Sequence, residues 1–132
     1  MPLLTTDLDN DEDIDIVVRF GGDVVAYEND GYGRFIKQLI IEDSYQASAL
    51  TIGDINGDEL PDLVYRSQSD YKLMKNLGDL QFAEAVKIND NSSSNLHEIV
   101  IADIDNDGQS DILSIHFDNL YWQKVLYPTE NK

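Results

Sequence analysis

The sequence predicts an all-β protein made of four-stranded blades of the kind that form β-propellers. The first observation is an acidic segment that occurs three times, beginning at Asp7, Asp54 and Asp103, which lie 47 and 49 residues apart. The second is that the segments between are short, rich in Val, Ile, Tyr and Phe, and bounded by Gly, Asn and Asp, a pattern typical of strands. The third is that no stretch combines helix caps with a sustained 3.6-residue period.

The repeats extend beyond the acidic segments. "TTDLDNDEDIDIVV" (5–18), "TIGDINGDELPDLV" (51–64) and "VIADIDNDGQSDIL" (100–113) align without gaps, and "VVAYENDGYGRF" (24–35) matches "YKLMKNLGDLQF" (71–82). Asn29 and Asn76 each lie 14 residues after the last aspartate of their acidic segment. The third copy loses this register over 120–132. We therefore expect one repeat domain over 1–132, with blades at approximately 1–47, 48–96 and 97–132, the third incomplete.

Each complete repeat contains four candidate strands. They are "PLLTT" (2–6), "DIDIVVRF" (13–20), "VVAYE" (24–28) and "RFIKQLII" (34–41) in the first repeat, and "ALTIG" (49–53), "DLVYR" (62–66), "YKLMK" (71–75) and "QFAEAVKI" (81–88) in the second. Four short strands in about 47 residues is the pattern of one propeller blade.

The composition limits the classes of molecule that the chain can be expected to bind. With 42% hydrophobic residues the chain has enough apolar side chains for a packed core. The net charge of -17 argues against nucleic acid and anionic membrane surfaces, and favours cations. The absence of Cys excludes disulfides and thiolate metal sites. No apolar run approaches the roughly 18 residues of a membrane span, and the N-terminus lacks a signal-peptide pattern.

The acidic segments have the spacing of a cation-binding loop. Counting from the first aspartate, side-chain oxygens fall at positions 1, 3, 5 and 9: Asp7, Asp9, Asp11 and Asp15 in loop one, Asp54, Asn56, Asp58 and Asp62 in loop two, and Asp103, Asp105, Asp107 and Asp111 in loop three. Position 7 is chemically varied (Asp13, Leu60 and Gln109), which suits a backbone carbonyl ligand. Together these atoms supply most of the six to eight oxygens that Ca²⁺ requires.

Other interpretations of these loops fit less well. An EF-hand needs a bidentate Glu at position 12 and flanking helices, but position 12 is Val18, Tyr65 and Ser114 and the flanks are strands. Mg²⁺ prefers a strict octahedron with several waters. A solvated acidic turn without metal is the plain alternative. Three matched copies argue against it, because unpaired like charges oppose folding. We therefore expect about three Ca²⁺ sites.

The three loops are not expected to bind equally. A sharp turn at position 6 favours Gly, which is present only as Gly108, while Glu12 and Glu59 occupy that place in the other loops. This predicts that loop three comes nearest to ideal geometry. Loop two, which has Asn56 in place of a carboxylate, should bind more weakly on charge count.

These residues resemble a known family. "GDINGDELPDLVY" and "ADIDNDGQSDIL", each followed by an apolar strand, look like the VCBS/FG-GAP repeats and the blades of integrin α-chain propellers. The resemblance covers nearly the whole chain, although "RFGGD" (19–23) holds only a trace of the name motif. It implies Ca²⁺ between the first and second strands of each blade. It also implies an extracellular or cell-envelope location, but no particular activity, because propellers have many functions.

Three blades are fewer than the four to eight that usually close a propeller. Two open ends would present apolar faces and unpaired strand edges. We therefore expect the chain to be part of a larger propeller or to associate with copies of itself, for example two chains forming a six-bladed ring.

The face opposite the acidic loops is the second candidate site. Arg19, Arg66 and His116 are expected at equivalent places there, and Tyr45 could offer a stacking surface. The interpretations left open are pairing of each basic group with a nearby carboxylate, and a rim that binds acidic or hydroxyl-rich ligands such as glycans. Tyr121 and Trp122 are expected in the core of the third blade.

No catalytic motif is present. The chain lacks a Gly-x-Ser-x-Gly elbow, a His-Glu-x-x-His helix and a phosphate loop. We expect a non-catalytic, calcium-stabilised module for adhesion, glycan binding or protein binding. The alternatives are the propeller part of a secreted carbohydrate-active enzyme whose catalytic residues lie elsewhere, and a purely structural or designed fragment.

Overall fold

The structure is a computed structural model, and it describes residues 3–20, 23–42, 47–67, 70–90, 96–116 and 119–125. Every regular element in these ranges is a β-strand. Within them no helix is long and apolar enough to cross a membrane. The predicted all-β class is therefore confirmed.

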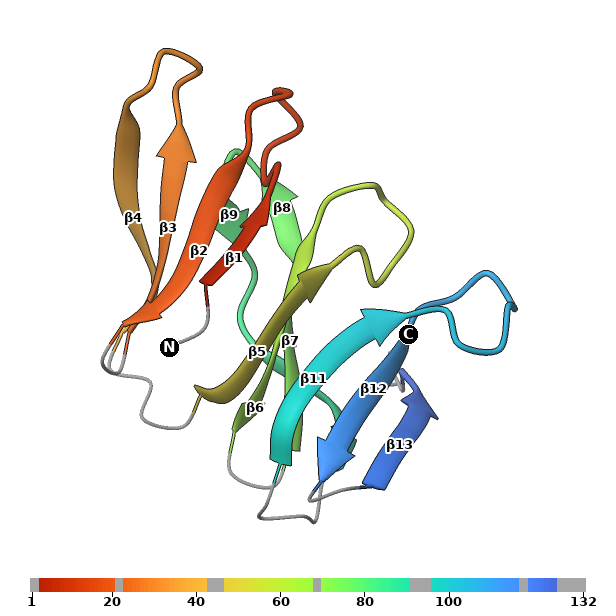
Figure 1. The fold of residues 1–132 in the computed structure, drawn as a ribbon. Coiled ribbons are helices and arrows are strands. Elements are labelled where there is room, and N and C mark those ends of the chain that lie inside the picture. Colours follow the sequence, from red (N-terminus) through yellow and green to blue (C-terminus); the bar gives the residue numbers. More distant parts are fainter. Residues whose placement is uncertain are drawn as a thin grey trace.

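The strands form three antiparallel sheets that stand beside one another as blades (Figure 1). Blade one has the order β1-β2-β3-β4, and blade two has the order β5-β6-β7-β10. Blade three holds β11, β12 and β13, and a separate hairpin pairs β8 with β9. The bounds are β1 (Leu3–Thr6), β2 (Asp15–Phe20), β3 (Asp23–Asn29), β4 (Phe35–Ile41), β5 (Ala47–Gly53), β6 (Asp62–Ser67), β7 (Asp70–Met74), β8 (Asn76–Gly78), β9 (Gln81–Phe82), β10 (Val86–Asp90), β11 (Leu96–Ala102), β12 (Asp111–His116) and β13 (Asn119–Lys124). The arrangement is a row of propeller blades that does not close into a ring.

The fourth strand of blade two differs from the prediction of one strand over 81–88. The chain instead forms the short hairpin β8–β9 and then resumes as β10, which pairs with β7. The cause is a tight turn in which Gly78, Asp79 and Leu80 have φ values of 91°, 52° and 59°. This turn places the Leu80 side chain in the core, where it is 2% exposed.

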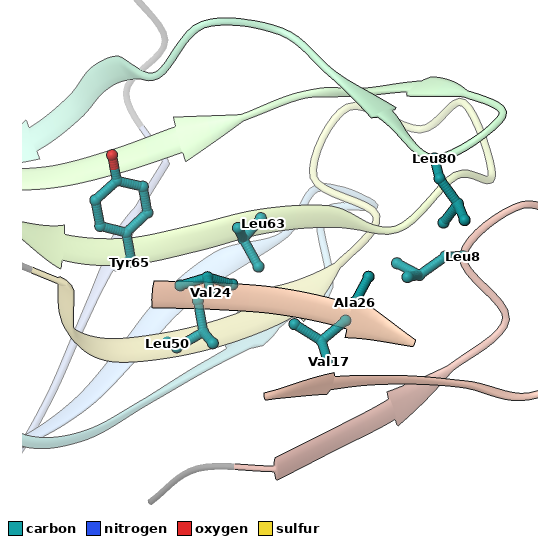
Figure 2. Close-up of a cluster of buried hydrophobic side chains, with 8 residues drawn as sticks. All are labelled: Leu8, Val17, Val24, Ala26, Leu50, Leu63, Tyr65 and Leu80. Carbon is teal, nitrogen blue, oxygen red and sulfur yellow. The ribbon is translucent and has the colours of Figure 1, made fainter. Parts of the chain in front are cut away.

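A hydrophobic core joins blade one to blade two (Figure 2). Because side chains alternate across a strand, Val17 and Val24 turn inward from β2 and β3. They belong to one cluster with Leu50 and Leu63 of blade two. Leu8, at position 2 of loop one, belongs to the same cluster and is fully buried. The first acidic loop is thus anchored in the core by its second residue.

A second core joins blade two to blade three. Val64 and Tyr71 contribute from the other face of blade two, and Ile99 and Ile112 contribute from blade three. Ile55, at position 2 of loop two, is buried in this cluster. Blade two is therefore covered on both faces, as an interior propeller blade must be.

The outward faces of the two end blades are apolar and exposed. On blade three, Val100, Leu113 and Trp122 are paired neighbours across β11, β12 and β13. Trp122 is 47% exposed, so its predicted position in the core is wrong, as is that of Tyr121. The strand was placed correctly, but Trp122 lies on the outward face, over which no described residue packs. Tyr121 lies on the other face, beside Ser114, and is exposed on the edge strand of the described sheet. On blade one, Leu3, Phe20 and Leu39 are exposed in the same way.

Asn76 ties the first two blades together. Its amide donates hydrogen bonds to the carbonyl oxygens of Leu8 at 2.8 Å and Pro61 at 2.9 Å, and its side-chain oxygen accepts the N–H of Gly78. Leu8 lies 68 residues earlier in the chain. Among the described residues, the side chain of the aligned Asn29 bonds only within its own blade, to the carbonyl of Ile14 and the N–H of Gly31.

Replacing Asn76 by Ala should therefore destabilise the chain more than replacing Asn29. We expect Asn76→Ala to cost about 2–4 kcal/mol, because it strands two carbonyl groups in or near the core. Asn29→Ala, at a more exposed place, should cost about 0.5–1.5 kcal/mol. Urea unfolding followed by Trp122 fluorescence measures both. Equal losses for the two variants would contradict the bridging role of Asn76.

Candidate metal centres

The three acidic loops occupy the same place in the three blades. Each connects the first strand to the second, and all three project from the same side of the molecule (Figure 1). Loops one, two and three comprise residues 7–15, 54–62 and 103–111. Their ninth residue is the first residue of β2, β6 or β12. The loops therefore begin and end at matched points of a rigid scaffold.

The first aspartate of each loop organises the turn. One oxygen accepts the N–H of position 6 at 2.8 Å in all three loops. The other accepts the N–H of position 5 at 3.1, 3.2 and 3.1 Å in loops one, two and three. Position 5 then accepts the N–H of position 7 at 2.9, 3.0 and 2.9 Å. These side chain-to-backbone bonds hold the backbone in a tight curve.

The ninth aspartate of each loop binds back to the start of the loop. Asp15, Asp62 and Asp111 are completely buried, and one oxygen of each accepts the N–H of position 2 at 2.8, 3.0 and 2.8 Å. In loops one and two the position-2 residue is buried in a core, whereas Ile104 of loop three is 40% exposed. In the first two loops the same carboxylate therefore fixes both the path of the loop and the position of a core residue.

Each loop has strained backbone conformations at both position 4 and position 6, not at position 6 alone. Positions 4 and 6 have positive φ in every loop: Asn10 and Glu12, Gly57 and Glu59, Asn106 and Gly108. Loop two has its glycine at position 4 and loop three at position 6, while loop one has none. A non-glycine residue in this region costs roughly 1–2 kcal/mol. Gly108 therefore relieves one of two strained positions, which is a smaller advantage for loop three than the sequence suggested.

Carboxylates from each loop converge. In loops one and three, ligand atoms from positions 1, 3 and 9 lie within 4.8 Å of one another: Asp7, Asp9 and Asp15, and Asp103, Asp105 and Asp111. In loop two the group of carboxylates is Asp54, Asp58 and Asp62, and position 3 is the amide Asn56. Asp11 and Asp107 at position 5 lie outside the carboxylate groups of their loops. The residues at position 7 donate their N–H groups to the side chain at position 5.

The electrostatics of loop one favour a cation. Burial, a hydrogen bond shared with Asp11, and the negative charges of Asp11, Asp15 and Glu28 raise the pKa of Asp9 from its ordinary 3.8 to about 7. In loop two, burial raises the pKa of Asp62, although N–H donors from Asn76 and Ile55 oppose the shift. Ionised carboxylates in these places are costly without a counter-charge.

The donor atoms fit a hard divalent ion. Asp9 Oδ1 and Asp111 Oδ1 are buried and have no hydrogen-bond partner within the described residues. A buried carboxylate oxygen in that state costs free energy unless a cation binds it. The surrounding side-chain donors are all oxygen atoms, which Ca²⁺ prefers. The three loops therefore have donor atoms that could hold a divalent ion, and the binding of Ca²⁺ stays a prediction.

The unpartnered oxygen in loop three has an identifiable origin. In the first two blades the other oxygen of the ninth aspartate accepts a backbone N–H from Asn29 or Asn76, both at 2.8 Å. The same place in blade three, 14 residues after Asp111, is Val125, and no such bond forms there. The recurrence of these two asparagines was visible in the sequence. Their role in holding the loop was not inferred from it.

Neighbouring loops also contact one another. The side-chain amide of Asn10 donates to the carbonyl of Glu59 at 3.3 Å, and the Ser110 hydroxyl donates to the carbonyl of Asp54 at 3.1 Å. Between loops two and three lies a cleft of about 450 Å³ lined by Ile55, Asn56, Gly57, Gly108, Gln109 and Ser110. The loops thus form one connected rim.

Loop three has one feature that the others lack. The ammonium group of Lys124, the last residue of β13, forms ion pairs with Asp105 and Asp107. The hydrogen bond from Lys124 lowers the pKa of Asp107, and the two carboxylates raise the pKa of Lys124. The spacing of the acidic residues in the sequence does not mark Lys124 as part of the site.

The three basic residues predicted on the opposite face do not all occupy equivalent places. Arg19 and Arg66 lie four residues after the ninth aspartate, whereas His116 lies five after it, so Ile115 is the equivalent residue. Arg19 and Arg66 follow the buried Val17 and Val64 by two residues, which places them on the faces that join the blades. Both are only partly exposed. The side chain of His116, and Tyr45 as a whole, lie outside the described residues.

Comparison with known proteins gives one family. A family model described as an FG-GAP-like repeat matches residues 7–65 and again residues 54–114. Each match begins at position 1 of an acidic loop and ends in the second strand of the following blade. No curated protein and no solved structure matches the chain.

The elevated pKa of Asp9 predicts an unusual pH dependence for the metal-free chain. The folded state holds a proton on Asp9 up to about pH 7, whereas the unfolded state releases it near the ordinary 3.8. Stability in chelator should therefore fall as pH rises through about 7, and recover toward pH 5. Thermal melts from pH 5 to 8 measure this.

Asp9→Asn is the control, because it removes the titrating group. It should flatten the pH dependence in chelator. An equally steep profile in Asp9→Asn would show that another group is responsible.

Proposed function

The chain belongs to the FG-GAP-like repeat family, and from that premise we propose that it is a calcium-binding, non-catalytic β-propeller module. Each of the three loops would bind one Ca²⁺. The observation that carries the proposal is the repeated convergence of three carboxylates within 4.8 Å, one of them completely buried, at the same place in each blade.

The ion would act first on stability. Each convergent group brings three like charges together, and an ion bound only by the folded chain stabilises it by mass action. Positions 1, 3, 5 and 9 would supply side-chain oxygens, position 7 its carbonyl, and water the remainder. Because the ninth aspartate also holds the position-2 anchor, ion binding would reinforce the joint between neighbouring blades.

The absence of catalysis is part of the proposal. The grouped acidic side chains of the described residues all lie in the three loops. A carboxylate that ligates Ca²⁺ is held ionised and is a poor general acid.

We place the module outside the cell or in the cell envelope, in adhesion or in glycan or protein binding. Calcium loops of modest affinity, with a Kd of about 10⁻⁴–10⁻³ M, suit the extracellular calcium level. FG-GAP repeats are found in extracellular proteins generally. The connected acidic rim is the surface we favour for a ligand, since Arg19 and Arg66 lie against the joints between blades rather than on an open face.

Calcium should raise the thermal stability of the chain. We expect the Tm to rise by several degrees between chelator and 5 mM Ca²⁺, if Kd is near 10⁻³ M or lower. Mg²⁺ at the same concentration should give a smaller rise. Asp54→Asn, which keeps the shape of a loop-organising side chain but removes its charge, should reduce the calcium effect. A Tm that does not change with Ca²⁺ would refute the metal proposal.

The exposed end faces point to further blades. The outer face of blade three consists of Val100, Leu113, Ile115, Leu120 and Trp122, and that of blade one includes Leu3, Phe20 and Leu39. Within the chain, the equivalent faces of blade two are covered by its neighbours. We propose that both end faces pack on blades of the same kind, supplied by a second copy of the chain or by further repeats.

For the isolated chain this predicts self-association through the end faces. Native mass spectrometry and sedimentation should detect dimers or larger assemblies. Trp122→Glu should shift them to monomer, because it buries a charge in the contact. Tyr32→Glu is the matched control, since Tyr32 is 89% exposed in the turn between β3 and β4, away from the end faces. A compact monomer of the unaltered chain at all concentrations would contradict the proposal.

A further inference from the structure

The contact between Lys124 and loop three has a consequence for calcium binding. The ammonium group pairs with Asp105 and Asp107, which are positions 3 and 5 of the loop. Both carboxylates belong to the set that would bind the ion. The lysine reaches them from the end of β13, a strand of the same blade. Loop three is therefore the one loop, among the described residues, whose candidate ligands are engaged by a cation of the chain itself.

The equivalent positions in the other blades behave differently. Lys124 lies 13 residues after Asp111, and the residues at the same spacing in blades one and two are Glu28 and Lys75. The negative charge of Glu28 acts on Asp9, a candidate ligand of loop one. Lys75 is exposed and takes no part in the ion pairs of the described residues. The same position of the blade therefore holds an anion in blade one, a solvated cation in blade two and an ion-paired cation in blade three.

We propose that Lys124 is a built-in competitor for Ca²⁺ in loop three. Its ammonium occupies the side of the loop formed by Asp105 and Asp107, and Ca²⁺ must displace it before these two carboxylates can bind the ion. This inference rests on the proposed function, because it assumes that the loops bind Ca²⁺. It reverses the ranking that the glycine at position 6 suggests.

The physical reason is competition for the same oxygen atoms. Ca²⁺ needs six to eight oxygen ligands, and without Asp105 and Asp107 the loop retains only two of its four side-chain ligands. An ammonium ion and a divalent cation repel each other if both remain. Both ion pairs are exposed and screened by water, so Ca²⁺ can displace the lysine, but only at a higher Ca²⁺ concentration.

The consequence is a staged response to calcium. Loop three is partly neutralised without metal, so blade three keeps its loop ordered when Ca²⁺ is scarce. Loop one, whose group includes three carboxylates with Glu28 nearby, is filled first. Loop three is filled last, when Ca²⁺ is high enough to release Lys124.

Two glycines allow loops two and three to be followed separately. Gly57 lies in loop two and Gly108 in loop three. Their backbone amide signals in ¹H–¹⁵N correlation spectra report ion binding to each loop during a Ca²⁺ titration. The variants are Lys124→Gln, which removes the competitor, and Lys75→Gln, the matched control at the same position of blade two. Lys124→Arg keeps the positive charge, so it separates the effect of losing the charge from the effect of changing the side chain.

The expected result is loop-specific. In Lys124→Gln, the Ca²⁺ concentration at half-saturation of the Gly108 signal should fall about tenfold, which corresponds to two exposed ion pairs. The Gly57 midpoint should change by less than about twofold, and Lys75→Gln should leave the Gly108 midpoint within the same limit. Lys124→Arg should stay close to the unaltered chain.

Two results overturn the proposal, and they are distinguishable. If both glycines respond to Ca²⁺ but the Gly108 midpoint is unchanged by Lys124→Gln, or is shifted equally by Lys75→Gln, the competition fails while the calcium function stands. If neither glycine signal responds to Ca²⁺ in any variant, the calcium function fails, and the competition with it.

Discussion

The buried aspartate at the start of the second strand of each blade is the constraint on which the rest of the structure depends. Asp15, Asp62 and Asp111 have no exposed surface, and each accepts the N–H of the second residue of its loop. That second residue is the apolar anchor, and in loops one and two it is buried between blades. One carboxylate therefore sets the start of a strand, the path of a loop and the packing of a joint between blades.

This arrangement makes the packing between blades depend on a buried negative charge. A carboxylate removed from water is costly unless it is hydrogen-bonded and paired with a cation. Backbone N–H groups satisfy both oxygens of Asp15 and Asp62, yet two further aspartates converge on each of them. The unbalanced charge at the rim is then a direct consequence of how the blades are joined. A divalent ion is the simplest partner that meets several carboxylates at one point.

Much of the fold could be predicted because the repeat is strong. Three gapless acidic segments fixed the blade period, and alternating apolar residues marked the strands on both sides of each loop. The prediction was wrong where the local chain departs from its copies. Asp79 and Leu80 adopt positive φ and turn the chain into a hairpin. Positive φ is uncommon for residues other than glycine, so these residue types do not predict it. The exposure of Trp122 depends on what packs over its blade, which a strand pattern does not contain.

The sequence predicted the candidate ligands of each loop but not the contacts from neighbouring strands that distinguish the loops. Spacing alone identified positions 1, 3, 5 and 9, because those residues can turn toward one point. Spacing could not reveal that Asn76 supports the loop below it from 14 residues away, or that Lys124 reaches across from β13. Both are contacts between segments brought together only by the sheet. The differences between the three loops therefore lie in the strands beside them as much as in the loops themselves.

Diffraction from a crystal grown with Ca²⁺, measured at a wavelength where calcium scatters anomalously, tests the central claim most directly. An anomalous peak should lie between Asp7, Asp9 and Asp15, with carboxylate oxygens at about 2.3–2.6 Å from the ion. Corresponding peaks should appear in loops two and three at sufficient Ca²⁺. Ordered loops that hold only water or protein groups at saturating Ca²⁺ would contradict it.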